Sequence, residues 1–457
     1  MVAIFLAAFT HYNVAESQNT LSRFVAVESL VVRGVSHIDD SAYGPAWTET
    51  VRTNGETMEL HRLNDMAYNK RDGHFYSSKP PVLTLMLAAV LWPVRGWVAG
   101  LEFSPRGMQQ VVFFMTWVVV GWFTALSFGV FRRKVGEALG GIEGDVLTAL
   151  TLGGTLFVTY SVTMNHHTLT AGLALMSLFL LGMVDIKDAP KQTVSAGPVL
   201  LAGFLMGLAS VIDIGPGVAF VIAIGLYMVL RRRSWRALLL FALGSIPPLA
   251  VHCAVQYGIW GTVLPVQMIG ATRSFPGNYW SHPGPPDSWH LSRSYYWLLT
   301  LMSGRGLLVL SPILLVGVAA LADDVARSLR QGRTGPGWLG LAKAGGAAAS
   351  EGYAALSVLF AIVFLVLYTS FSAPTNFNGS CYGMRYYIGF MPVLAFYAAR
   401  GFVRWKDSKR FRVRFYALGL ISMFFALAGM EHPWLLMENN LNPVVQVLML
   451  ALRGFSA

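Results

Sequence analysis

Long apolar runs separated by short polar gaps make up most of the chain after residue 110. A helix needs roughly 20 consecutive apolar residues to cross the hydrocarbon core of a bilayer. The pattern therefore predicts an all-α fold, a polytopic membrane helical bundle with about 11 spans. The expected spans are residues 110–131, 146–164, 168–186, 197–213, 217–230, 237–257, 306–322, 353–370, 386–399 and 415–430, with a weaker candidate at 442–452.

The first hundred residues follow another pattern. Residues 1–10 (MVAIFLAAFT) supply about half of the apolar length that a span requires, so we interpret them as the outer half of a first transmembrane helix. Residues 11–109 are expected to form a large extracytoplasmic loop bearing interfacial helices, and residues 110–457 the multi-span bundle. Within the loop, apolar residues recur near helical spacing in Leu21–Ile38 with charged residues between them, which is typical of a helix lying on the bilayer surface.

Basic residues in the gaps indicate the side of the membrane on which each gap lies. Cytoplasmic loops carry an excess of lysine and arginine, and every second gap of this chain is basic. This alternation orients the bundle and makes residues 11–109 extracytoplasmic. The basic gaps contain Arg132–Lys134, Lys187 and Lys191, Arg231–Arg236, Arg327–Lys343, and Arg400–Arg414.

The apolar segment Pro81–Gly100 has two interpretations. It is long enough to span the membrane, but Pro93 and Arg95 interrupt it, and a crossing there would put Arg132–Lys134 on the wrong side. We favour an interfacial or partly sunk helix on the outer face, with a genuine span as the alternative.

Composition supports the same class of protein. The chain is 54% hydrophobic and 12% charged, whereas a soluble domain is about a quarter charged. Its net charge of +11 would suggest nucleic-acid binding only if the basic residues shared one surface, and here many lie in short clusters between apolar runs. We therefore expect an integral protein of the inner (plasma) membrane, with membrane lipid as a partner and no nucleic acid.

Two polar segments on the outer side carry the strongest candidate chemistry, GHFYSSKPPVL (Gly73–Leu83) and NFNGSCYGMRYY (Asn376–Tyr387). Lys79 precedes two prolines that stiffen the backbone, so it is well placed to meet a lipid phosphate, although a lysine that anchors the membrane interface has the same pattern. Arg385 lies where positive charge is scarce and can bind phosphate in bidentate fashion; an ion pair with a loop acid is the alternative.

A third polar group, Asn165, His166 and His167, lies at the outer end of a span. A histidine there can assist proton transfer, or it can be a satisfied residue at a helix mouth. Adjacent histidines point about 100° apart on a helix, and no HExxH spacing appears, so no metal site is predicted. The identity of any cofactor stays open.

This layout, with its motifs, resembles the GT-C glycosyltransferases, in particular the bacterial branch of protein mannosyltransferases and aminoarabinose transferases. Members use a lipid-linked sugar, work on the outer face, and carry the catalytic acid in the first outer loop. One departure concerns ESQNTLSR (Glu16–Arg23), where Asn19 or Thr20 stands in place of the expected aspartate. The resemblance rests on SRFVAVESLVVRGVSHIDD (Ser22–Asp40), NDMAYNKRDGHFYSSKPP (Asn64–Pro81), YSVTMNHHTLTA (Tyr160–Ala171) and GSCYGMRYY (Gly379–Tyr387).

The resemblance implies transfer of a sugar from a polyprenyl-phosphate donor to an extracytoplasmic acceptor, with inversion. Such a reaction needs a carboxylate that takes the acceptor proton and cations that stabilise the departing phosphate. Any single loop acid can also be an ordinary solvated carboxylate, and Asp39 stays an alternative base. The implied residues are Asp65, Glu16 and Asp40 for catalysis, Lys79, Arg385 and Arg305 for the donor phosphate, and Tyr76, Asn165, His166, His167 and Tyr386 for substrate binding.

Two other functions remain open. A secondary transporter or lipid flippase would have polar groups at the bilayer midplane and two similar halves, whereas here the polar candidates gather at one face. A catalytically silent membrane subunit would explain the missing aspartate. The residues do not identify the sugar or the acceptor.

Overall fold

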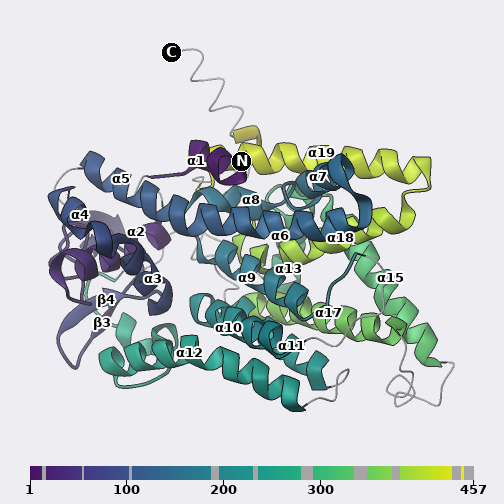
Figure 1. Ribbon diagram of the computed structural model, residues 1–457. Coiled ribbons are helices and arrows are strands. Elements are labelled where there is room, and N and C mark those ends of the chain that lie inside the picture. The colour runs from purple at the N-terminus through teal and green to yellow at the C-terminus, as the bar shows by residue number, and fades with distance from the viewer. Residues whose placement is uncertain are drawn as a thin grey trace.

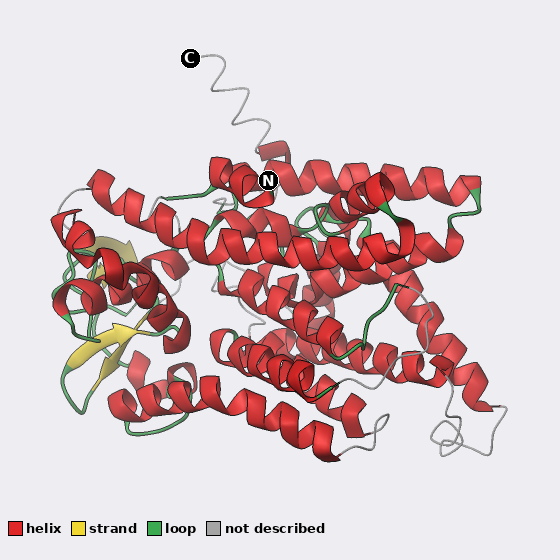
Figure 2. Cartoon of the chain, in the orientation of Figure 1, coloured by secondary structure: helices red, strands yellow, loops and turns green. Residues whose placement is uncertain are grey.

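The computed structural model describes residues 1–12, 17–53, 56–101, 105–186, 195–229, 235–278, 292–333, 347–372, 381–434 and 444–446. These residues form a helical membrane bundle with a small polar unit at one end, on the left in Figures 1 and 2. Five described helices are long and apolar enough to cross a membrane, or up to seven if two bent pairs each form one span. The predicted helical bundle is confirmed, and the chain is an integral membrane protein. The number of about 11 spans is not confirmed.

The polar unit comprises residues 17–101, and it contains strands as well as helices. Its two antiparallel hairpins pair Thr48 with His61 at the ends of one sheet and Asn69 with His74 next to the turn of the other. Gly73 adopts a φ of 78° in that second turn, a left-handed conformation that favours glycine. The sequence pattern predicted only helices in this region, and this prediction was incomplete because it lacked both hairpins. The elements are α2 (Gln18–Glu28), a π-helical turn (Ser29–Arg33), β1 (Thr48–Thr53), β2 (Glu56–His61), β3 (Met66–Asn69), β4 (His74–Ser77), α3 (Pro81–Leu91) and α4 (Arg95–Leu101).

Helix α2 matches the interfacial helix expected over Leu21–Ile38 in position, but its surroundings differ from that expectation. It packs against α3 and β4, and its polar residues are buried together with the apolar ones. Arg23 in particular has no exposed surface. The polar stripe of the helix therefore faces the protein interior instead of water.

The remaining helices form the bundle. Helix α10 packs against α9, α11 and α12, and α15 packs against α17 and α18. The bundle elements are α1 (Val2–Phe9), α5 (Pro105–Met115), a π-helical turn (Thr116–Gly121), α6 (Trp122–Leu139), α7 (Gly141–Thr151), α8 (Leu156–Thr159), α9 (His166–Leu180), α10 (Ala196–Ile212), α11 (Ile214–Tyr227), α12 (Trp235–Trp260), α13 (Arg293–Met302), α14 (Leu307–Leu310), α15 (Leu314–Arg333), α17 (Ala347–Ser372), α18 (Met391–Trp405) and α19 (Lys409–Glu431).

Two of the expected continuous spans are broken. The span expected at 146–164 consists of two helical pieces at an angle of 75°, and the one at 306–322 contains a bend of 100°. Hydropathy averages over a window and does not register such bends. The segment Pro81–Gly100 does meet the length and hydropathy of a span, so both of its interpretations stand. The weaker candidate at 442–452 falls mostly outside the described residues.

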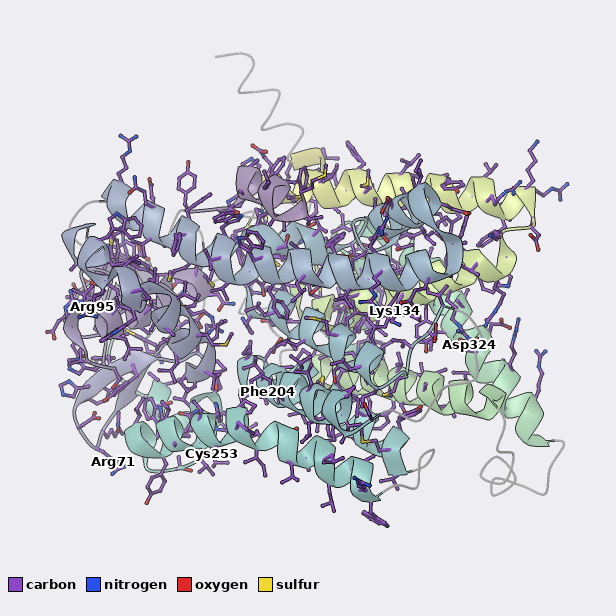
Figure 3. All side chains as sticks on the ribbon, in the orientation of Figure 1. Arg71, Arg95, Lys134, Phe204, Cys253 and Asp324 are labelled. Carbon is purple, nitrogen blue, oxygen red and sulfur yellow. The ribbon has the colours of Figure 1, made fainter. Side chains whose placement is uncertain are left out.

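The charged residues that are labelled in Figure 3 lie toward the two ends of the bundle. Lys134 and Asp324 lie at one end, and Arg71 and Arg95 lie at the other, which carries the polar unit (Figure 3). At the Lys134 end, Arg400 is buried and donates to Asp324 at 2.9 Å. Lys134 and Arg400 come from two different gaps that the sequence pattern places on the cytoplasmic side, and both lie at this end of the bundle.

Close contact between α10 and α12 depends on glycine. A Cβ atom added at Gly203 would collide with the carbonyl oxygen of Phe241, and one added at Gly207 would lie 2.8 Å from the backbone of Ser245. Small residues spaced four apart let membrane helices approach this closely.

Replacing Gly203 by alanine should therefore destabilise the bundle by about 1–3 kcal/mol, the usual cost of overpacking a tight contact. We expect a lower melting temperature of the purified protein in detergent. Gly197→Ala is the matched control on the same helix, because nothing lies within 4 Å of its added Cβ. Alanine there should leave the melting temperature unchanged or raise it slightly. Equal losses in both variants would contradict the contact.

Candidate active site

Helix α2 holds the segment that precedes β3. The Gln18 side chain accepts from the Asn64 backbone N–H and donates to the Arg62 carbonyl, both at 2.8 Å. One turn further on, the Ser22 hydroxyl donates to the carbonyl oxygen of Asp65 at 2.6 Å. These bonds fix the position of Asp65 relative to α2.

The end of β4 positions Lys79 beside Asp65. The Ser22 and Ser77 hydroxyl oxygens are 2.6 Å apart, and the backbone N–H of Lys79 donates to the Ser77 hydroxyl at 3.3 Å. Pro81 starts α3, a position where its missing N–H leaves no helical hydrogen bond unmade. The Lys79 Nζ atom lies 2.7 Å from Oδ2 of Asp65, and each side chain is 17% exposed. The two residues form a largely buried ion pair.

Arg23 adds a second cation from α2. Its side chain is completely buried, and none of its three guanidinium nitrogens has a hydrogen-bond partner among the described residues. It interacts electrostatically with Asp65 and Asp213. Burial lowers the pKa of Arg23 to about 10 against the opposing effect of these two acids, so it stays charged at neutral pH.

The pKa values of the ion pair reflect this excess of positive charge. Burial raises the pKa of Asp65, but Lys79, and Arg385 and Arg273 beyond it, outweigh that effect and hold the pKa below its ordinary value. Burial lowers the pKa of Lys79, Asp65 opposes that effect, and the neighbouring arginines lower the pKa further. The pKa of Asp65 is lower in the folded than in the unfolded protein, so its ionised carboxylate stabilises the fold. This contribution is fully present above the unfolded pKa of about 3.9, and it disappears as the pH falls through the folded pKa.

A buried group of histidines lies next to the ion pair. His167 donates from Nδ1 to Oδ2 of Asp213 at 2.5 Å, and Nε2 of His166 lies 4.0 Å from the other oxygen of the same carboxylate. The amide nitrogen of Asn19 is 3.3 Å from Nδ1 of His166. Asn165 caps α9 by accepting from the His167 backbone N–H at 2.8 Å. Lys79, Arg23 and Arg385 all act on His166 electrostatically, which joins this group to the ion pair.

Asp213 brings a third ligand-type side chain to the two adjacent histidines. Ligand atoms of His166, His167 and Asp213 all lie within 4.8 Å of one another. The surrounding lysine and arginines oppose the binding of a further cation there.

Arg385 approaches the group from the start of the segment that leads into α18. Its guanidinium lies 5.3 Å from the ring centre of Tyr386 and 5.2 Å from that of Trp434, and Tyr386 in turn meets His167 edge to face at 5.5 Å. The Arg385 Nε atom is buried and has no hydrogen-bond partner in the described part of the chain. The two aromatic faces hold a cation whose hydrogen-bonding capacity is only partly used.

An apolar cavity opens beside Lys79. It comprises about 530 Å³ of empty space that is partly open to solvent. It is lined by side chains of α2, the π-helical turn after it, α3 and α12, among them Leu30, Leu85 and Ile259. Lys79 and Ser77 lie at its polar edge. A wall of this composition suits a hydrocarbon chain.

Other predicted residues lie elsewhere. Asp40 is exposed in the turn after α2, and Glu16 lies outside the described residues. Tyr76 lines the cavity, and its hydroxyl donates to Asp72 at 2.8 Å. Arg305 is buried against Cys381, whose carbonyl oxygen it binds, so it supports the segment that carries Arg385.

Comparisons with known proteins give matches to solved structures at low sequence identity. No family model matches the chain, and no curated protein matches it. Two solved structures of ArnT from Cupriavidus metallidurans resemble it, one in the apo state and one bound to undecaprenyl phosphate. They are 15% and 14% identical to this chain, with TM-scores of 0.43 and 0.42, and each match covers 91% of this chain and 60% of that chain.

ArnT is an aminoarabinose transferase of GT-C fold, the branch that the sequence motifs resemble. The present chain spans about 60% of the length of these structures.

Two residues near the ion pair and the histidines, Arg23 and Asp213, were not among the site residues predicted from the sequence. The spacing of Arg23 within an amphipathic helix suggested a surface position, and only the packing around α2 shows that it is buried. Asp213 follows α10 directly and precedes α11, so it is an acid near the end of an apolar helix, and this was the available signal.

Replacing Asp65 by asparagine should destabilise the protein more than replacing Lys79 by methionine. The first change adds to the unbalanced positive charge, whereas the second reduces it. We expect the Asp65→Asn variant to lose about 1–3 kcal/mol, measured as a lower melting temperature in detergent. Inorganic phosphate should restore part of that loss, because an anion replaces the missing charge. A larger loss in Lys79→Met would contradict the charge imbalance.

Proposed function

We propose that this chain is a GT-C-type glycosyltransferase that moves a sugar from a polyprenyl phosphate to an acceptor on the extracytoplasmic side of the inner membrane. The observation that carries the proposal is the Asp65–Lys79 ion pair set among additional cations, of which Arg23 is completely buried. Arg23, Lys79, Arg385 and Arg273 outnumber Asp65 and Asp213, four positive groups to two negative ones. Such a site favours an anionic ligand.

The charge excess suits the chemistry of a phosphate leaving group. A sugar-bearing polyprenyl phosphate is a diester, and its phosphate gains negative charge as the bond to the anomeric carbon breaks. Cations already in position stabilise that developing charge more than they stabilise the bound donor, and this difference lowers the barrier. We assign Lys79, Arg23 and Arg385 to the donor phosphate. Arg305 is a positioning residue behind Arg385.

The apolar cavity beside Lys79 supports a lipid donor over a soluble one. Its hydrocarbon walls border the lysine, so an isoprenoid chain lying there would bring its terminal phosphate to the cations. Tyr76 would contribute to the wall of the cavity. A soluble nucleotide sugar would gain nothing from such a wall.

Asp65 is the proposed general base. Its depressed pKa keeps the carboxylate ionised, but Lys79 occupies it. A donor phosphate would compete for Lys79 and leave the carboxylate free to take the acceptor proton. The acceptor oxygen would then attack the anomeric carbon as the phosphate leaves, in one step with inversion. Asn165, His166, His167 and Tyr386 are proposed to contact the sugar or the acceptor.

A transporter is the second candidate, and a silent subunit the third. The described polar groups converge near one end of the bundle, next to the polar unit, and this favours an enzyme over a carrier with a midplane site. The absence of an acid at Asn19 or Thr20 is the argument for a silent subunit, and the ionised Asp65 is the argument against it.

Transfer activity can be tested in proteoliposomes with a panel of polyprenyl-phosphate-linked sugars as donors and with lipid and peptide acceptors. Asp65→Asn should lower kcat by roughly 100-fold or more, because general acid–base catalysis typically contributes 10²–10⁴-fold. Lys70→Ala is the control, since Lys70 is an exposed lysine of the same hairpin. Movement of the lipid across the membrane without sugar transfer would support the transporter, and neither activity would support the silent subunit.

Donor binding can be measured separately with farnesyl phosphate, a short isoprenoid phosphate, by titration calorimetry in detergent. Arg23→Met, Lys79→Met and Arg385→Met should each weaken binding by roughly 10–100-fold, the loss of one charge-assisted hydrogen bond. Lys70→Ala should bind as the wild type does. Unchanged binding in all three variants would remove the phosphate site even if the protein proved active.

A further inference from the structure

A second cluster of ligand-type side chains lies within the polar unit, on the turn after α2 and the first residue of β4. Oδ2 of Asp39 lies 2.8 Å from Nδ1 of His74 and 3.1 Å from Nδ1 of His37. The two imidazole rings are stacked, with centres 4.3 Å apart and planes 10° apart. Ligand atoms of all three residues lie within 4.8 Å of one another.

Hydrogen bonding accounts for only part of this cluster. His74 donates to Asp39, but Nδ1 of His37 is shielded from solvent and has no hydrogen-bond partner among the described residues. The atom is thus at the right distance from the carboxylate but in the wrong direction for a hydrogen bond. A shared ion between the two rings and the carboxylate would satisfy it.

The backbone already holds the carboxylate in place. The other oxygen of Asp39 accepts from the Phe75 backbone N–H at 3.0 Å, and the Ile38 N–H donates to the Phe75 carbonyl at 2.9 Å. Ligands fixed by such outer bonds lose little freedom when a metal binds.

The local charge also favours a cation. Asp72 accepts from the backbone N–H of His74 at 3.0 Å, so a second carboxylate borders the cluster. This contrasts with His166, His167 and Asp213, on which lysine and arginine side chains act.

We propose that His37, Asp39 and His74 bind a zinc ion, with water as the fourth ligand. Two imidazole nitrogens and one carboxylate oxygen are a common zinc donor set, and bonds of about 2.0–2.2 Å put neighbouring ligands roughly 3.3 Å apart. The observed separations from the carboxylate oxygen, 3.1 and 2.8 Å, are close to this value, and the two stacked rings tilt apart on binding so that both lone pairs point at the ion. On binding, each ring presents the lone pair of one nitrogen to the metal and keeps its proton on the other, so His74 changes tautomer and no net proton is released.

The ion would act as a structural clip. It would tie the turn that follows α2 to the start of β4, the strand that ends at Ser77, two residues before Lys79. The site does not depend on the proposed transfer reaction, because it would exist in a silent subunit as well.

The test uses the full chain in detergent, treated with a chelator, dialysed, and then titrated with zinc alone. Metal content after desalting should show one more zinc ion per wild-type chain than per chain of His37→Gln or His74→Gln. Zinc should raise the melting temperature of the wild type and not that of these variants. Cobalt, bound in place of zinc, should give the visible absorption of a tetrahedral site in the wild type only.

Two controls make the outcome decisive. His61→Gln changes a histidine of the same unit that contacts the Pro45 carbonyl, and it should keep the zinc ion. Gel filtration and circular dichroism identify any variant that fails to fold, and for such a variant Asp39→Asn, which can still accept from Phe75, replaces the histidine changes. The proposal is overturned if the wild type binds no zinc, or if the ion is lost in His166→Gln and kept in His74→Gln.

Discussion

The candidate site depends on keeping several cations close together where little water reaches them. Lys79 has a carboxylate partner at 2.7 Å, but Arg23 is completely buried and its guanidinium has no hydrogen-bond partner among the described residues. An uncompensated buried charge costs several kcal/mol, so a loosely folded segment would release it to solvent. The surrounding structure must therefore be rigid enough to prevent that release.

This requirement explains the construction of the polar unit. Helix α2 is buried around nearly its whole circumference, and it uses Gln18 and Ser22 to bind the backbone that carries Asp65. The β3–β4 hairpin then returns the chain to the same place. There the Ser77 hydroxyl, at the end of β4, accepts from the backbone N–H of Lys79. The two stretches that flank the hairpin, one before β3 and one after β4, are thus held in adjacent positions by these hydrogen bonds. Packing and these hydrogen bonds offset the free-energy cost of burying the cations.

Much of the fold follows from local pattern, because hydropathy alone decides whether a helix can lie in lipid. The runs at 237–257 and 415–430 became α12 and α19, and the Lys-Pro-Pro element correctly marked the start of α3. The sequence pattern could not predict which way each face of a helix is oriented. The amphipathic stripe of α2 suggested a surface helix, yet its polar side faces inward, since periodicity does not say which environment each face meets. The bends near residues 152–155 and 311–313 and the meeting of His166 and His167 with Asp213 likewise depend on contacts between distant segments.

The pairing of Asp65 with Lys79 also has a consequence for the order of events on the proposed pathway. While the lysine holds the carboxylate, the base is poorly available to an acceptor, and a donor phosphate is the natural competitor for the lysine. Donor binding would then both supply the electrophile and free the base, so an acceptor bound alone would meet an inactive site. Asn19 fits this arrangement, because its amide lies beside His166 in the cluster without adding a charge. An acid at that position would offset the cation excess that favours the phosphate. Under the proposed function, a neutral residue in place of the expected aspartate would strengthen donor binding and leave proton transfer to Asp65.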